Sequence, residues 1–167
     1  DRADLNANFR DEYYALVPAV SDDADGPPLV TSGLIDPGRC RWGELPVTFA
    51  KRTFAAPRVD LGKLDGRFPA WAARKLVPKV LVADPDGAWL PGVPVSTVTP
   101  SAGDPDPVHT VWELAAVLTS PVASVHAWHW AAGTGLSTTA VRLGPAVLAA
   151  VPWPAGDLRP AVFALRA

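Results

Sequence analysis

Four polar stretches rich in proline, glycine and aspartate interrupt this chain and limit what it can fold into. They are Ser21–Pro28, Asp36–Gly38, Asp84–Gly87 and Pro100–Pro107. Proline fixes one backbone torsion and glycine accepts a positive φ, so such stretches form turns and loops. The apolar runs between them show helical spacing in some places and strand-like content in others. The sequence therefore predicts an α+β fold, with small mixed sheets packed against a few helices.

Apolar residues at helical spacing predict short helices along the whole chain. The first is an amphipathic helix that Asp4 or Asn6 can cap and that Pro18 ends. Ser120 is the expected cap of a later helix, which Gly133–Gly135 ends. The expected helices are Asp4–Val17, Pro69–Leu76, Thr110–Leu118, Pro121–Ala132 and Pro145–Ala150.

Short runs rich in β-branched and aromatic residues predict the strands. They are Leu29–Thr31, Leu45–Phe54, Lys79–Ala83, Val93–Val98 and Ala140–Leu143. The apolar run Val111–Val125 is expected to pack against the sheet, together with four tryptophans. These are Trp112, Trp128, Trp130 and Trp153.

Charge is segregated along the chain although the net charge is only −2. Residues 1–38 hold eight acidic and two basic side chains, and residues 80–141 hold five acidic and no basic ones. Residues 39–79 hold ten basic and three acidic side chains. Aromatic residues alternate with these cations: Trp42, Phe49, Phe54, Phe68 and Trp71. Such a segment is either a surface that meets phosphates and bases, or a solvated charged face over aromatic core residues.

The sequence offers little for catalysis or metal binding. It contains no glycine-rich phosphate loop, no Gly-x-Ser-x-Gly and no His-Glu-x-x-His. His126 and His129 stand three apart on an expected helix without a carboxylate or cysteine to complete a metal site. Cys40 is the single cysteine, so it forms no internal disulfide and a reducing, cytoplasmic setting fits best. The flanking Arg39 and Arg41 would favour its thiolate, but no partner base is evident, so a structural role is expected.

Several segments, taken in order, resemble the C-terminal specificity region of bacterial N-6 adenine DNA methyltransferases of restriction-modification systems. The resemblance covers most of the chain and lies in the order of the segments, since each alone is of low specificity. The segments are FRDEYY (9–14), LVTSGLIDPGRCRWGE (29–44), FAKRTFAAPRVDLGKL (49–64), LVPKVLVA (76–83), LPGVPVSTV (90–98), LAAVLTSPVAS (114–124) and GTGLSTTAVRLGPAVLAAVPWP (133–154).

This resemblance implies a non-catalytic recognition domain that binds double-stranded DNA. The family's cofactor-binding glycine motif and its Asn/Asp-Pro-Pro-aromatic tetrapeptide are missing here, so S-adenosylmethionine would belong to a separate methyltransferase domain of the same parent chain. Residues 1–28 would be a helix and acidic linker at the junction with that domain, and residues 29–167 the recognition domain. The start at Asp1 and the lack of methionine favour a piece of a longer protein. The passage from Ala83 to Asp84 is shorter than the resemblance implies, as though a loop were missing there.

Candidate DNA contacts follow from the charge pattern and the resemblance. The candidates for reading base edges are Arg39, Arg41, Lys51 and Arg52. The candidates for phosphate contacts are Lys63, Arg67, Arg74, Lys75 and Lys79. About half of these are expected to be merely solvated or salt-bridged. Arg58, next to Pro57, is expected to be structural.

Two other functions compete with DNA recognition. The acidic net charge would suit a protein-interaction or scaffold module that kept the fold and lost DNA binding. A hydrolase using Cys40, or His126 and His129, would need a convergent set of titrating groups that the sequence does not supply. The charge-free stretch Leu114–Val141 contains Pro121, Gly133 and Gly135, so no membrane partner is expected.

Overall fold

The computed structural model describes residues 3–7, 10–77, 79–80, 83–131 and 144–167, and within them the fold is α+β, as predicted. The helices are α1 (Arg10–Leu16), η1 (Val17–Ala19), η2 (Ser32–Leu34), η3 (Leu61–Lys63), α2 (Phe68–Lys75), α3 (Pro107–Leu118), α4 (Pro121–Ala131), α5 (Pro145–Ala149) and α6 (Arg159–Arg166). The strands are β1 (Ala3–Ala7), β2 (Val20–Ser21), β3 (Leu29–Val30), β4 (Ile35–Asp36), β5 (Arg39–Cys40), β6 (Val47–Phe49), β7 (Arg52–Phe54), β8 (Arg58–Val59), β9 (Leu90–Pro91) and β10 (Ser96–Pro100).

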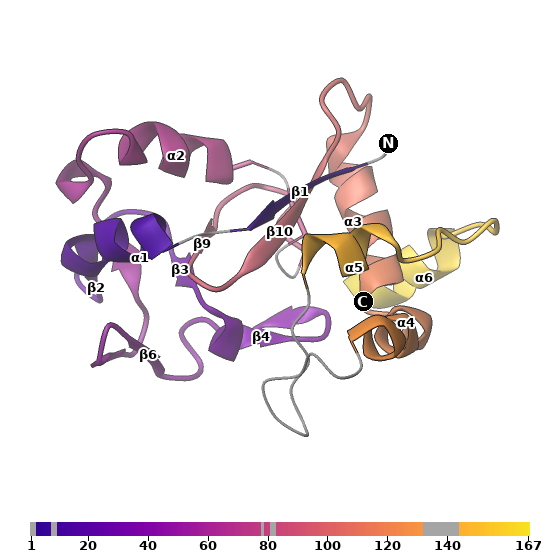
Figure 1. The fold of residues 1–167 in the computed structure, drawn as a ribbon, viewed down its shortest axis with the longest axis horizontal. Coiled ribbons are helices and arrows are strands. Elements are labelled where there is room, and N and C mark those ends of the chain that lie inside the picture. The colour runs from indigo at the N-terminus through magenta and orange to yellow at the C-terminus, as the bar shows by residue number, and fades with distance from the viewer. Residues whose placement is uncertain (1–2, 8–9, 78, 81–82, 132–143) are drawn as a thin grey trace.

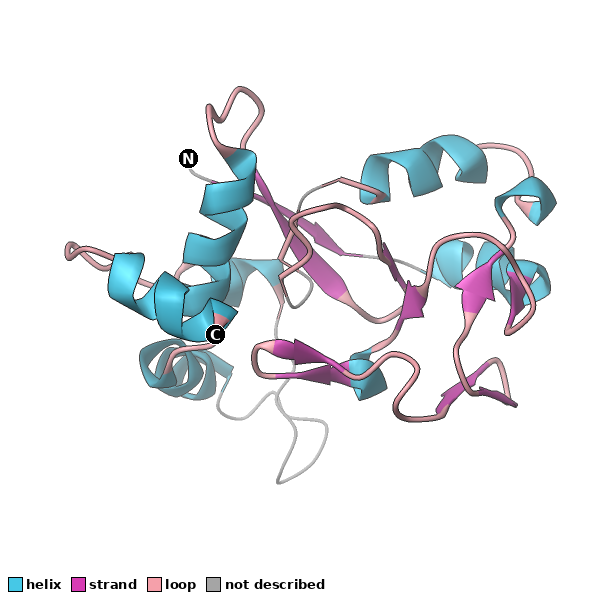
Figure 2. Ribbon diagram, turned by 180° about the vertical axis from the view of Figure 1, so that it is seen from behind, coloured by secondary structure: helices cyan, strands magenta, loops and turns pink. Residues whose placement is uncertain are grey.

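The described strands pair two by two. β1 and β10 form the longest pairing, antiparallel, with Leu5 opposite Val98, and this ribbon runs between the two ends of the molecule (Figure 1). β2 pairs antiparallel with β8, and β3 pairs parallel with β9. The remaining pairs, β4–β5 and β6–β7, are hairpins, each closed by a two-residue turn. Helices α3 to α6 gather at one end. Figure 2 shows α2 and the β6–β7 hairpin on opposite sides of the other end, and the β4–β5 hairpin on the same side as β6–β7 but nearer the helices.

The expected opening helix is wrong in its first part. Residues 3–7 form a strand, and the helix begins only at Arg10. The periodicity of Leu5 and Tyr13 suited one long helix, but pairing with β10 far along the chain outweighed the local preference. Tyr13 and Leu16 remain on the helix and contribute to the core, whereas Phe9 lies outside the described residues.

The acidic segment Ser21–Pro28 packs against the body of the protein rather than acting as a free linker. The Asp22 carboxylate accepts hydrogen bonds from the backbone amides of Ala55 and Ala56 at 3.0 and 2.9 Å. The Gly26 carbonyl accepts one from Arg58 at 3.0 Å. The division of the chain at residue 28 stays a prediction, but the segment before it shares the core of the segment after it.

The main core lies between α1, the hairpins and α2. Phe49, Phe54 and Trp71 from the basic segment are buried in it, which fits aromatic core residues beneath a charged surface. A second group of buried residues surrounds α3: Val98, Val111, Leu114, Ala115, Val117, Ala123 and Val162. The expected role of Trp128 and Trp130 in the core is wrong, since they are 52% and 61% exposed.

Helix caps and turns explain most boundaries. The Ser120 hydroxyl accepts from the Ala123 amide to begin α4, as predicted. The Asp106 side chain accepts from the His109 amide, so α3 begins at Pro107 and not at the expected Thr110. α2 and α5 also lie where they were expected, and Gly38 takes a φ of 72° in the predicted turn between β4 and β5. The expected helix end at 133–135 and strand at 140–143 lie outside the described residues.

Other strand predictions are confirmed in part. β3 lies within the expected Leu29–Thr31 strand, and Leu45–Phe54 forms the β6–β7 hairpin instead of one strand. β10 begins at Ser96 rather than at Val93, and Lys79 and Val80 make only isolated bridges. α6 was not predicted. Among the described helices none is long and apolar enough to cross a membrane alone; by length and composition only, the pair formed by 107–118 and 121–130, bent by 63°, passes that test.

Candidate nucleic-acid interface

The cations of residues 39–79 are spread over separate elements. Lys51 and Arg52 lie on the β6–β7 hairpin and Arg39 on β5, on one side of the molecule. Arg74 and Lys75 lie on α2, on the opposite side (Figures 1 and 2). The basic segment therefore does not form one continuous positive face.

Arg39 and Arg41 are held by nearby carboxylates. Arg39 donates to both carboxylate oxygens of Glu44, at 3.0 and 2.9 Å. Arg41 donates to Glu44 at 2.9 Å and to Asp36 at 3.0 Å. Hydrogen bonds from Arg39 lower the pKa of Glu44, so this carboxylate stays charged and offsets its neighbours. Two of the expected base-reading residues are thus already engaged at the surface.

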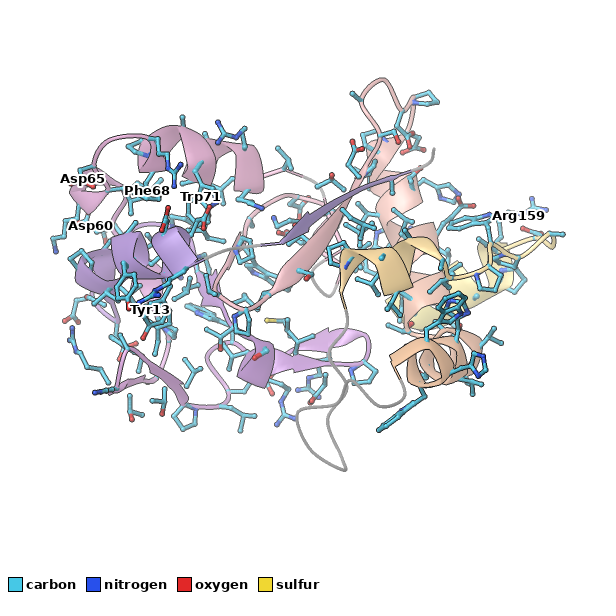
Figure 3. The ribbon with its side chains drawn as sticks, in the orientation of Figure 1. Tyr13, Asp60, Asp65, Phe68, Trp71 and Arg159 are labelled. Atoms are coloured by element: carbon cyan, nitrogen blue, oxygen red, sulfur yellow. The ribbon has the colours of Figure 1, made fainter. Side chains whose placement is uncertain are left out.

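Two expected phosphate contacts are also paired. Lys63 lies 3.3 Å from a carboxylate oxygen of Asp60, and Arg67 donates to Asp11 at 2.8 Å. All four side chains are exposed, so these pairs contribute little to stability. Asp60, Asp65 and Phe68 lie at the end of the molecule that carries α2, and Arg159 lies at the opposite end, among helices α3 to α6 (Figure 3).

Lys75 and Lys79 are buried, which is inconsistent with phosphate contacts. Lys79 is 0% exposed and donates to the Asp84 carboxylate at 2.6 Å and to the Val77 carbonyl at 3.2 Å. Burial lowers the pKa of Lys79, and the Asp84 carboxylate opposes that shift. Burial also lowers the pKa of Lys75. These two lysines belong to the interior of the protein.

Arg58 is structural, as predicted. Besides its hydrogen bond to Gly26, its guanidinium lies 4.8 Å from the centre of the Trp42 ring. The Trp42 indole in turn donates to the Pro57 carbonyl at 2.9 Å. These contacts connect the segment before β3 with Trp42, which follows β5, and with residues 57–58, which follow β7.

The β6–β7 hairpin carries two cations with no carboxylate partner among the described residues. Lys51 makes no hydrogen bond or ion pair there, and Arg52 lies with its guanidinium 5.0 Å from the centre of the Phe54 ring. Residues 45–59 contain no aspartate or glutamate. The turn holds Ala50 and Lys51 at φ of 50° and 62°, where asparagine and glycine are the usual residues. Such strain outside glycine is concentrated at functional sites in proteins.

A hollow of about 450 Å³ lies beside this hairpin. It is bordered by residues 46–51 on one side and by Tyr13, the Thr31–Gly33 turn and Val93–Pro94 on the other. The Thr31 hydroxyl is buried and has no hydrogen-bond partner. The Tyr13 ring lies 5.1 Å from the Phe49 ring, which fixes the hairpin against α1. Tyr13, Thr31 and Val93 could not be assigned to a site from the sequence, because only the fold brings them to the hairpin.

Cys40 does not have the activated thiolate that its two arginine neighbours suggested. Burial raises the pKa of its thiol above the ordinary value, and Glu44 and Asp36 engage the arginines. Cys40 packs instead at the border of the core.

The folded chain is therefore expected to react with a thiol-specific disulfide reagent at pH 8 several-fold more slowly than the urea-unfolded chain. The thiol loses its proton at a lower pH in the unfolded state than in the folded state. Its contribution to stability is therefore present below the unfolded pKa and is lost as the pH rises through the folded pKa. The wild type minus Cys40→Ala difference in free energy of unfolding, measured from pH 7 to 10.5, checks this. Equal thiol reactivity in both states would contradict it.

The histidines form no site with other ligands. Within the part of the chain that the structure describes, no group of three or more His, Cys, Asp or Glu side chains lies close enough to hold a metal ion. His109 lies 3.4 Å from Glu113 on α3, and the buried Nε2 atom of His126 has no hydrogen-bond partner. Cys40 lies on β5 and both His126 and His129 on α4, so the described residues provide no nucleophile, base and orienting group together.

Comparison of the chain with models of protein families, with curated proteins and with solved structures gives no match.

Proposed function

We propose that this chain is the DNA sequence-recognition domain of an N-6 adenine DNA methyltransferase. A methyl donor cannot reach an adenine stacked in a duplex, so such an enzyme must extrude the base while another surface holds the flanking pairs. In this proposal the chain supplies the holding surface, and a separate domain binds S-adenosylmethionine and transfers the methyl group. The ordered resemblance along the sequence is one support, and the β6–β7 hairpin is the other.

The observation that carries the proposal is the pair of uncompensated cations on this hairpin. Lys51 and Arg52 project from an element that has no acidic residue between positions 45 and 59. Phosphate binding depends on cations that can release counterions from DNA, and cations already held by carboxylates contribute less. The hairpin carries two such cations, whereas α2 carries one, Arg74, which is exposed and has no carboxylate partner among the described residues.

The test is binding of the 167-residue chain to mixed-sequence duplex DNA across a salt series. Lys51→Glu/Arg52→Glu is expected to weaken binding at least ten-fold at low salt and to reduce the slope of log K against log salt by about 1 to 2, roughly 0.9 for each phosphate that is no longer neutralised. The matched control is Lys63→Glu/Arg67→Glu, which makes the same charge change at two cations already paired with carboxylates, those of Asp60 and Asp11. The changed net charge lowers the affinity of both variants for DNA to a similar extent. Apart from that common loss, the affinity of the control is expected to stay within about two-fold of wild type.

Two outcomes would contradict the proposal. If wild type shows no salt-dependent binding at low ionic strength, this chain is not a DNA-binding module. If both double variants weaken binding equally, the attraction is a property of net charge and the hairpin is not the interface.

A protein-interaction module is the second candidate, favoured by the exposed apolar surface of α4. Val122, Val125, Trp128 and Trp130 are each more than half exposed on this helix. In the recognition-domain proposal, a surface of this kind would suit contact with the methyltransferase domain of the same parent chain. Absence of DNA binding in the salt series would favour the interaction module instead.

A further inference from the structure

The two faces of the β6–β7 hairpin differ sharply. In the strand register, Val47 lies opposite Phe54 and Thr48 lies opposite Thr53. Val47, Phe49 and Phe54 are buried, whereas both threonines are exposed. Because successive strand residues point to opposite faces, the hairpin presents a paired threonine face to solvent, with Lys51 at the adjoining tip.

We infer that this hairpin enters the major groove and that Lys51, Thr48 and Thr53 determine DNA sequence specificity. The inference rests on the proposed function and adds the groove and the residues. A two-stranded antiparallel ribbon fits the major groove, which is about 12 Å wide. A lysine ammonium can donate to O6 and N7 of guanine, and a threonine offers a hydroxyl that donates or accepts and a methyl that packs on thymine. The ribbon face therefore suits a short site containing a G·C pair beside A·T pairs.

Arg52 has a different role, because its guanidinium is placed over the Phe54 ring on the inner side of the ribbon. From there it contacts a backbone phosphate rather than a base edge. It sets the depth and register of the hairpin, as phosphate contacts do in protein–DNA complexes.

The hairpin is held rigidly enough to discriminate between bases. Three of its six strand residues are anchored in the core, and Phe49 also packs on Tyr13 of α1. The turn has only Ala50 and Lys51 between the strands, so the lysine has little backbone freedom. A residue whose backbone is already positioned loses less conformational entropy when it binds.

The experiment is selection of bound duplexes from a randomised pool by the 167-residue chain, followed by affinity measurements on the selected site. Lys51→Met keeps side-chain length and removes the ammonium, and Thr48→Val/Thr53→Val keeps the shape and removes the hydroxyls. Wild type is expected to select a guanine at one position, with roughly ten-fold or greater discrimination. Lys51→Met should lose that preference and the valine variant should lose the preference at neighbouring positions. Arg52→Met should weaken binding to all sequences alike while its preferences remain.

A modified base tests the groove directly. Replacing the selected guanine by 7-deazaguanine removes the N7 acceptor in the major groove, and it is expected to weaken wild type several-fold and Lys51→Met hardly at all. If 7-deazaguanine has no effect on wild type, or if Lys51→Met weakens all sequences equally, the specificity role is overturned although DNA binding stands. Salt-dependent binding without any sequence preference would overturn it too. Absence of salt-dependent binding would overturn the proposed function itself.

Discussion

Asp84→Ala is expected to lower the free energy of unfolding by about 3–5 kcal/mol, because it leaves a buried ammonium without its partner. The Lys79 side chain is 0% exposed and that of Asp84 is 4% exposed, and the two groups meet at 2.6 Å. Asp84 also accepts from the amides of Ala88 and Trp89 at 2.9 and 3.0 Å. The substitution therefore leaves the Lys79 ammonium without a counterion, with only the Val77 carbonyl as acceptor, and two amide donors without acceptors. Urea unfolding followed by tryptophan fluorescence measures the loss.

Two control variants separate the ion pair from the substitution as such. Lys79→Met/Asp84→Asn removes both charges and keeps an amide oxygen for Ala88, so it is expected to recover much of the stability lost in Asp84→Ala. Lys63→Met breaks the exposed pair with Asp60 and is expected to cost less than about 1 kcal/mol. A cost below about 1 kcal/mol for Asp84→Ala would show that the pair is not buried in solution.

Local signals in the sequence predicted those parts of the fold that local interactions determine. Ser120 caps α4 because its side-chain oxygen reaches an amide one turn ahead, and this depends only on neighbouring residues. Gly38 allows the turn after Pro37 for the same reason. The position of Arg58 next to Pro57 predicts a structural role, and its contacts with Gly26 and Trp42 confirm this.

Features that depend on distant residues were not predictable. Leu5 lies on a strand because β10 is there to pair with it, more than ninety positions later. From the sequence, Lys79 is indistinguishable from a surface cation. Only the fold shows that it is buried in an ion pair with Asp84. Trp128 and Trp130 are large apolar residues of the kind that usually lies in a core. α4, however, lies at the edge of the group formed by helices α3 to α6, and both side chains are exposed to solvent. For the candidate site, the sequence identified Lys51 and Arg52 but not Thr48 and Thr53, because their orientation follows from hairpin register.

Gly26→Ala is expected to destabilise the protein by about 3 kcal/mol or more, since overpacking against backbone cannot be relieved by a change of rotamer. A Cβ atom at Gly26 would overlap the carbonyl oxygen of Val59 and lie 2.8 Å from its carbonyl carbon. Val59 is fully buried and its amide donates to the Pro27 carbonyl at 3.0 Å, so this backbone cannot withdraw without loss. The thermal midpoint and the urea midpoint are both expected to fall.

Gly156→Ala is the matched control, because a Cβ atom there would have nothing within 4 Å. It is expected to leave the free energy of unfolding within about 0.5 kcal/mol of wild type. The comparison also decides the nature of the acidic segment Ser21–Pro28. A free linker tolerates an added methyl group at Gly26 as readily as position 156 does, so equal stability of the two variants would restore the linker interpretation. A large and selective loss in Gly26→Ala would mean that residues before position 28 fold together with the β2–β8 pair, and that a cut at 28 would remove part of the core.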